Sequence, residues 1–110
     1  MRISTENLSS EIYLMPFNAT AVLAYHFLKN KGIFVTSFCD NNKALRGNRY
    51  DGCEILDPTE AFGKNLKGVI ILCESLHYDA IAKQCVEIGF KKVLYLEQIL
   101  PYDGAALLSG

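Results

Sequence analysis

The stretch IYLMPFNATA, residues 12–21, decides how the rest of the chain is interpreted. Its first four residues are apolar, as in a buried strand, and a helical pattern begins near Ala19. Pro16, Phe17 and Asn18 form the short connection between the two. A buried strand that turns directly into a helix is typical of an α/β domain, so we expect strands and helices to alternate along the chain.

Five strand patterns fit this expectation. Apolar runs typical of buried strands occur at residues 11–15, 33–38, 53–56, 68–73 and 92–96. Runs such as VIIL are continuous rather than alternating, which favours a parallel sheet covered on both faces. Because crossovers between parallel strands are right-handed, we predict a three-layer α/β domain. Its mostly parallel sheet has about five strands in the order 3-2-1-4-5.

Three helical patterns lie between these strands. The first, residues 19–31, ends at Gly32 and has one apolar stripe, formed by Ala21, Ala24, Tyr25 and Leu28. A short second helix is expected after Asp57, a good capping residue. The third is expected to be capped by Ser75 and to end at Gly89.

Length and composition restrict the class of protein. The 110 residues suffice for one domain, with its core at residues 11–100 and a tail at 101–110, and we expect it to be a module of a larger protein. The net charge is −1, which gives no electrostatic case for nucleic acid. The apolar runs are too short to span a membrane, and the polar N-terminus has no signal-peptide core, so we expect a cytoplasmic protein.

The cysteines and other reactive side chains form no recognisable catalytic or metal-binding set. No C-x-x-C pair occurs among Cys39, Cys53, Cys73 and Cys85, so we expect buried free thiols. Tyr78 lacks the lysine four residues later that a Tyr-x-x-x-Lys dehydrogenase site needs, and His77 beside Glu74 has no evident partner. We therefore predict no catalytic residue and no metal ligand in this chain.

The connection after the first strand lies where dinucleotide-binding units carry the glycine loop G-x-G-x-x-G/A. The three signature positions fall on Pro16, Asn18 and Ala21, while Phe17 adds bulk beside the space for a pyrophosphate. The helix start still offers backbone N–H donors, those of Thr20, Ala21 and Val22. Two interpretations stay open: the loop binds a pyrophosphate, or it is a structural turn with little phosphate affinity.

Asp40 ends the second strand pattern, 24 residues after Pro16. An acid about 20 residues beyond the glycine loop binds ribose hydroxyls in NAD-type sites, whereas a turn-capping Asp is the alternative. The polar residues 41–52 that follow are expected to be a surface excursion with a turn at Asp51-Gly52. Its basic residues either meet a phosphate or are merely solvated: Lys43, Arg46 and Arg49. The candidate ligand contacts are Pro16, Phe17, Asn18, Ala19, Thr20, Ala21, Asp40, Asn41 and Ser75.

Two further stretches carry a family resemblance. FCDNN, residues 38–42, and GNRYDGCEI, residues 47–55, match an F-x-D-(D/N)-(N/D) and a G-x-x-(Y/F)-x-G-x-x-(I/V) pattern. From Glu11 to Leu100 the chain resembles the small Rossmann-like domain of sugar-nucleotide epimerase/dehydratase relatives and bacterial polysaccharide-biosynthesis proteins. The resemblance implies a nucleotide-binding fold that serves a larger enzyme of surface-polymer synthesis. The chain departs from this family at residues 16–18, where the family has its glycine loop.

Two functions therefore stay open. In the first, the chain binds a nucleotide or nucleotide sugar, with NAD or NADP as candidate cofactors, and is accessory to a sugar-modifying or glycosyl-transferring enzyme. In the second, it is a structural or interaction domain that kept the frame without the ligand. The apolar residues of the tail predict a homodimer or a docked partner domain in either case.

Overall fold

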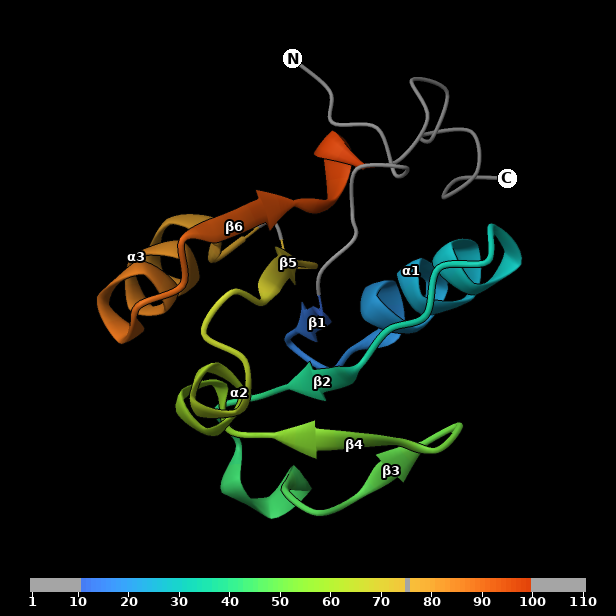
Figure 1. Ribbon diagram of the computed structural model, residues 1–110, viewed down its shortest axis with the longest axis horizontal. Coiled ribbons are helices and arrows are strands. Elements are labelled where there is room, and N and C mark those ends of the chain that lie inside the picture. Colours follow the sequence, from blue (N-terminus) through green and yellow to red (C-terminus); the bar gives the residue numbers. More distant parts are fainter. Residues whose placement is uncertain (1–10, 75, 100–110) are drawn as a thin grey trace.

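The computed structural model describes residues 11–74 and 76–99. Among these residues, the strands form one six-stranded sheet in the spatial order β3-β4-β2-β1-β5-β6 (Figure 1). Five strands are parallel, and β3 pairs antiparallel with β4 at one edge. The strands are β1 (Ile12–Met15), β2 (Ser37–Cys39), β3 (Arg49–Tyr50), β4 (Cys53–Leu56), β5 (Val69–Leu72) and β6 (Lys92–Tyr95).

The five parallel strands are the five predicted segments, and they lie in the predicted order. The sheet has one more strand than predicted, because β3 forms within the segment expected to be a surface excursion. Asp51 and Gly52, the predicted turn, join β3 to β4 with φ angles of 51° and 82°. Two successive residues with positive φ suit the twist of a tight hairpin, which brings Tyr50 opposite Cys53. β2 is shorter than predicted, since its pairing with β1 begins only at Ser37.

The helices follow the predicted patterns, with one corrected start. α1 (Ala19–Asn30) buries the predicted stripe of Ala21, Ala24, Tyr25 and Leu28. α2 (Pro58–Lys64) begins after Asp57, whose side chain accepts a hydrogen bond from the Thr59 N–H. α3 (Tyr78–Ile88) begins after His77 and ends at Gly89, so the prediction of a Ser75 cap is wrong. Ser75 itself lies outside the described residues. No helix in residues 11–74 and 76–99 combines the length and the apolar character needed to cross a membrane.

The sheet lies between two helical layers. α1 covers one face, and α2 and α3 cover the other (Figure 1). Side chains of β1 alternate between the two cores: Ile12 and Leu14 pack on the α1 side, whereas Tyr13 and Met15 pack on the α2–α3 side. All four are buried, which is the physical reason for the continuous apolar runs in the sequence.

All four cysteines are free thiols. Cys39, Cys73 and Cys85 are buried, as predicted, and Cys53 is half-buried. Removal from water disfavours a charged thiolate, so burial raises the pKa of Cys73 to about 12 and that of Cys85 to about 11. These thiols therefore act as small apolar side chains of the core.

Candidate functional site

The carboxyl ends of β1, β2 and β5 meet at one edge of the sheet. α1 connects β1 to β2 across one face, whereas α2 leads to β5 across the other, so the strand order reverses between β1 and β5 (Figure 1). Ligands of open α/β sheets bind in the crevice at such a point. We call this edge the rim and define it by residues 16–20, 40–42, 73–74 and 76–77.

The loop between β1 and α1 is tied to both neighbouring strands of the rim. The Phe17 N–H donates a hydrogen bond to Asp40 Oδ2, at 3.0 Å. On the other side, Asn18 Nδ2 donates to the Cys73 carbonyl oxygen at 3.3 Å. The Met15–Pro16 peptide bond is cis. Asn18 thus occupies the position between β1 and β5 at which the strand order reverses.

Asn18 also changes which donors of the helix start are available. Its Oδ1 accepts a hydrogen bond from the Ala21 N–H at 2.8 Å, and its carbonyl oxygen accepts one from the Val22 N–H at 3.0 Å. Two of the three predicted donors are therefore already engaged. Within the described residues, no group accepts a hydrogen bond from the N–H of Ala19 or of Thr20. The donors left unengaged at the start of α1 are therefore those of Ala19 and Thr20.

The ring of Phe17 packs into the core on the α1 side. It makes an edge contact with Phe38, at 5.0 Å between ring centroids, and a tilted contact with Tyr50 at 6.0 Å. Tyr25 joins the same cluster, with its ring 5.7 Å from those of Phe38 and Tyr50. Phe17 therefore anchors the loop to β2 and β3 through apolar contacts.

Asp40 caps the turn, as one of the two alternatives predicted. Its Oδ1 accepts a hydrogen bond from the Asn42 N–H at 2.8 Å, while its Oδ2 binds the Phe17 N–H. The carboxylate therefore already holds two backbone donors, although its lone pairs can accept further hydrogen bonds. A contact with a ribose or sugar hydroxyl stays a prediction.

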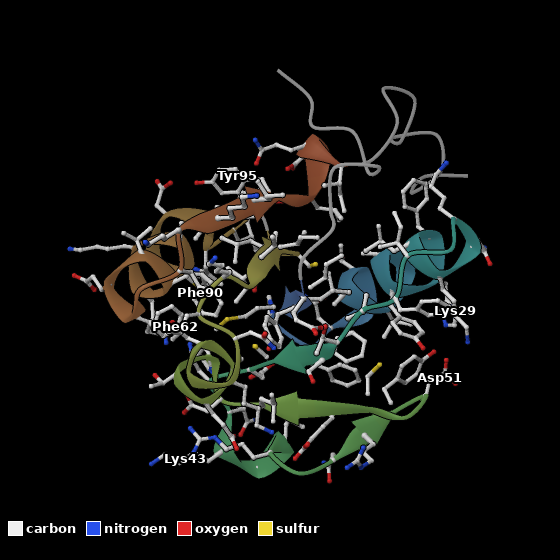
Figure 2. The ribbon with its side chains drawn as sticks, viewed as in Figure 1. Lys29, Lys43, Asp51, Phe62, Phe90 and Tyr95 are labelled. Atoms are coloured by element: carbon white, nitrogen blue, oxygen red, sulfur yellow. The ribbon has the colours of Figure 1, made fainter. Side chains whose placement is uncertain are left out.

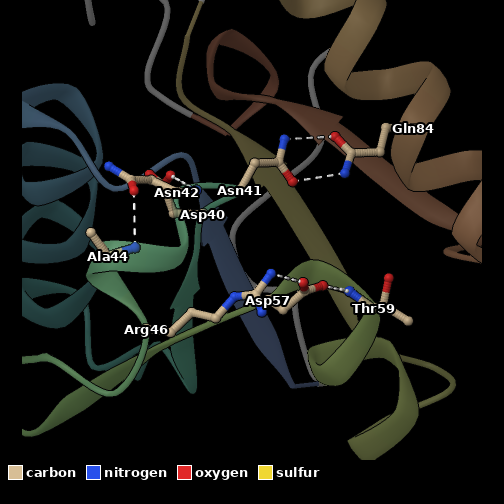
Figure 3. A network of polar contacts seen from close by, with 8 residues as sticks. All are labelled: Asp40, Asn41, Asn42, Ala44, Arg46, Asp57, Thr59 and Gln84. Carbon is tan, nitrogen blue, oxygen red and sulfur yellow. Dashed lines mark hydrogen bonds and ion pairs between the residues drawn. The ribbon is translucent and has the colours of Figure 1, made fainter.

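Asn41 connects the rim to α3. Its side-chain amide forms two reciprocal hydrogen bonds with that of Gln84, at 2.9 and 2.8 Å (Figure 3). These bonds link the end of β2 to the second turn of α3. The amide of Asn41 is thus held in one orientation at the rim.

The basic residues of the segment 41–52 have different surroundings. Arg46 forms an ion pair with Asp57, the residue that caps α2 (Figure 3). Arg49 donates to the Gly52 carbonyl oxygen at 3.1 Å. Lys43 is exposed at the start of the short 3-10 helix η2 (Lys43–Leu45). Of the three, Lys43 is the one for which no described ion pair is found.

Among the described residues near the start of α3, no acid–base pair is found. His77 is exposed, and the Tyr78 hydroxyl donates to Glu97 at 3.0 Å. Burial, together with this bond to Glu97, raises the pKa of Tyr78, so the hydroxyl stays protonated at neutral pH. The part of the chain that the structure describes holds no group of three His, Cys, Asp or Glu side chains able to bind a metal ion.

One polar cluster was missed by the sequence analysis. Tyr25 and Lys29 of α1 both donate to Asp51 Oδ2, at 2.5 and 2.9 Å, at the turn of the β3–β4 hairpin. The bond from Tyr25, and then the one from Lys29, lower the pKa of Asp51. A cavity of about 410 Å³ lies beside this cluster, at the amino ends of β2 and β4 and so away from the rim. The i, i+4 spacing of Tyr25 and Lys29 was the local signal, but their shared partner could be found only in three dimensions.

Comparison with solved structures supports the fold. The chain is similar to UDP-D-quinovosamine 4-dehydrogenase from Vibrio fischeri, with a TM-score of 0.66 and 13% identity over 91% of this chain and 85% of that one. It is also similar to RSP, a Rex-family repressor, with a TM-score of 0.60 and 16% identity over 96% of this chain and 58% of the repressor. A complex of RSP with beta-NAD+ and operator DNA gives a TM-score of 0.56. No protein-family model matches the chain, and neither does any curated protein sequence.

At these identities the likeness establishes the fold and nothing finer. The chain is a Rossmann-like α/β domain, similar in structure to a sugar-nucleotide enzyme and to a repressor. The resemblance inferred from residues 38–42 and 47–55 is therefore confirmed for the fold. The absence of a nucleic-acid partner stays a prediction, since one of the similar structures is bound to DNA.

Proposed function

We propose that this chain is a nucleotide-binding module that holds a nucleotide or nucleotide sugar at the rim. We place it in the cytoplasm, as an accessory to an enzyme that modifies or transfers sugars for surface polymers. One observation carries the proposal. The unengaged N–H groups of Ala19 and Thr20 and the carboxylate of Asp40 all lie at the rim, the edge at which the strand order of a Rossmann-like sheet reverses.

The rim would bind its ligand without a glycine loop. Ala19 and Thr20 would donate hydrogen bonds to a phosphate oxygen at the positive end of the α1 dipole. Asp40 would accept a hydrogen bond from a ribose or sugar hydroxyl while it keeps the Phe17 and Asn42 N–H groups. NAD and NADP are the candidate cofactors, and we expect that the chain alone is not catalytic.

A second candidate function follows from how the loop satisfies its own polar groups. The Asn18–Cys73 and Asp40–Phe17 hydrogen bonds hold the rim together without any ligand. A carboxylate beside the loop also repels a phosphate. These contacts favour a structural or interaction domain that serves a neighbouring domain, or a second copy of the chain.

Thermal unfolding separates the two candidates. The melting temperature is measured with NAD, NADP, a UDP-sugar and a CDP-sugar, because a ligand that binds only the native state raises it by mass action. Asp40→Ala should abolish the increase. Asp57→Ala is the matched control, since Asp57 also follows the carboxyl end of a strand, β4, but there it caps α2 outside the rim. A nucleotide that raises the melting temperature of the wild type and of Asp57→Ala supports binding at the rim. No increase at millimolar concentration favours the structural role.

A further inference from the structure

A second cavity lies at the opposite edge of the sheet, where β5 and β6 begin. Its volume is about 550 Å³, within the range of small-molecule sites. It is lined by Phe62 of α2, by Leu66 and Lys67 of the loop that leads to β5, and by Lys91 and Lys92 at the start of β6. Because the parallel register pairs Val69 with Lys92, the loops before these two strands lie side by side. The site is thus separate from the rim.

The apolar floor of this cavity is fixed in position. The ring of Phe62 makes an edge contact with Phe90, at 5.3 Å between centroids (Figure 2). Gly89 lies at the tip of that ring, and a Cβ at this position would come within 2.6 Å of the Phe62 Cζ. The missing side chain therefore lets the ring seat against α3. Leu66, with 63% of its surface exposed, completes an apolar wall that faces solvent.

The charge around the cavity has one sign. Lys67, Lys91 and Lys92 are exposed, and none takes part in the ion pairs found among the described residues. No acidic side chain of residues 11–74 and 76–99 lines the cavity. This contrasts with the net charge of −1 for the whole chain. Three ammonium groups around an apolar wall complement an anion that is attached to an apolar body.

We infer that this cavity, which we call the lysine pocket, binds a small amphipathic anion with an acyl or aromatic body and a carboxylate or phosphate head. The apolar body packs against Phe62 and Leu66, and the head lies among the lysines. Lysine is suited to this role because its ammonium is a mobile point charge that can follow a head group of either geometry. The inference does not depend on nucleotide binding at the rim.

An NMR titration of the isotope-labelled chain with octanoate tests the inference. Amide shifts should concentrate at residues 62–67 and 89–92. In the double variant Lys67→Gln/Lys91→Gln the affinity should fall about three- to tenfold, since each exposed ion contact contributes a small factor. The matched control is Lys43→Gln/Lys83→Gln, which removes the same charge from exposed positions outside the pocket and should leave the affinity unchanged. Octanamide, with the same body and no charge, should bind more weakly than octanoate.

Three results would overturn the inference. The first is the absence of saturable shifts with octanoate at millimolar concentration, and the second is a set of shifts scattered over the whole surface. The third is evidence that the lysines do not recognise the head group, whether from equal binding of octanoate and octanamide or from an equal loss of affinity in the two double variants. A nucleotide that fails to bind at the rim affects none of these outcomes.

Discussion

Replacing Phe17 by alanine tests whether the loop is anchored by its ring. Truncation of a fully buried Phe costs about 3–5 kcal/mol. Phe17 is half-buried, but its edge contact with Phe38 adds roughly 0.5–1.5 kcal/mol to the burial term. We therefore expect Phe17→Ala to lower the free energy of unfolding by about 2–3 kcal/mol, with a fall of roughly 8–20 °C in the melting temperature.

Urea unfolding of three proteins measures this effect: the wild type, Phe17→Ala and the control Phe34→Ala. Phe34 has 75% of its surface exposed, so its truncation should change the free energy of unfolding by no more than about 0.5 kcal/mol. If the two variants lose the same small amount, the ring of Phe17 is not packed on the α1 side. It would then be free to cover the rim, and our description of the loop would be refuted.

Three further predictions concern other contacts. Asn18→Ala should lower the free energy of unfolding by about 1–2 kcal/mol, because it removes the cap of α1 and the hydrogen bond to the carbonyl oxygen that follows β5. Asn42→Ala removes only the cap of η2 and should cost less, so equal losses in urea unfolding would contradict the role given to Asn18. At pH 8 an alkylating reagent should label Cys53 in the native chain before the other three thiols, because their deeper burial raises their pKa more than that of Cys53. Simultaneous labelling of all four thiols, measured by mass spectrometry, would count against the buried core. The pKa of Asp51 is lower in the folded than in the unfolded chain, so its carboxylate stabilises the fold above about pH 3.9 and loses this effect as the pH falls below that value. Asp51→Asn should therefore make the free energy of unfolding fall less steeply at acid pH than in the wild type. Parallel curves for the two proteins would refute the Tyr25 and Lys29 contacts.

The sheet order and helix faces could be predicted because they depend on local patterns of burial. Ala21, Ala24 and Leu28 recur at helical spacing, and each proved to be buried. β3 could not be predicted in the same way. It has two residues, of which Arg49 is exposed and Tyr50 is half-buried, so it carries no alternating pattern. Its pairing depends on the turn at Asp51-Gly52, which was recognised as a turn but not as a hairpin.

The candidate site was predicted less completely than the fold. Asn18 caps α1, and asparagine before a helical pattern is a common cap, so this contact is of a kind that local sequence can indicate. Its second bond, to Cys73, joins residues 55 positions apart, and Asp40 reaches Phe17 across 23 positions. No spacing rule connects such residues. Only the folded sheet brings them together.

The affinity of Ala19→Pro for the nucleotide that binds best tests the central claim most directly. Ala19 is the first residue of α1, where proline is well tolerated, and Asn18 before it already has an extended backbone. The substitution therefore removes one N–H from the rim and leaves the helix intact. We predict a free energy of unfolding within about 0.5 kcal/mol of the wild type, and an affinity about tenfold lower by calorimetric titration, as expected for one lost hydrogen bond to a charged group. An unchanged affinity in a variant of unchanged stability would contradict binding at the start of α1.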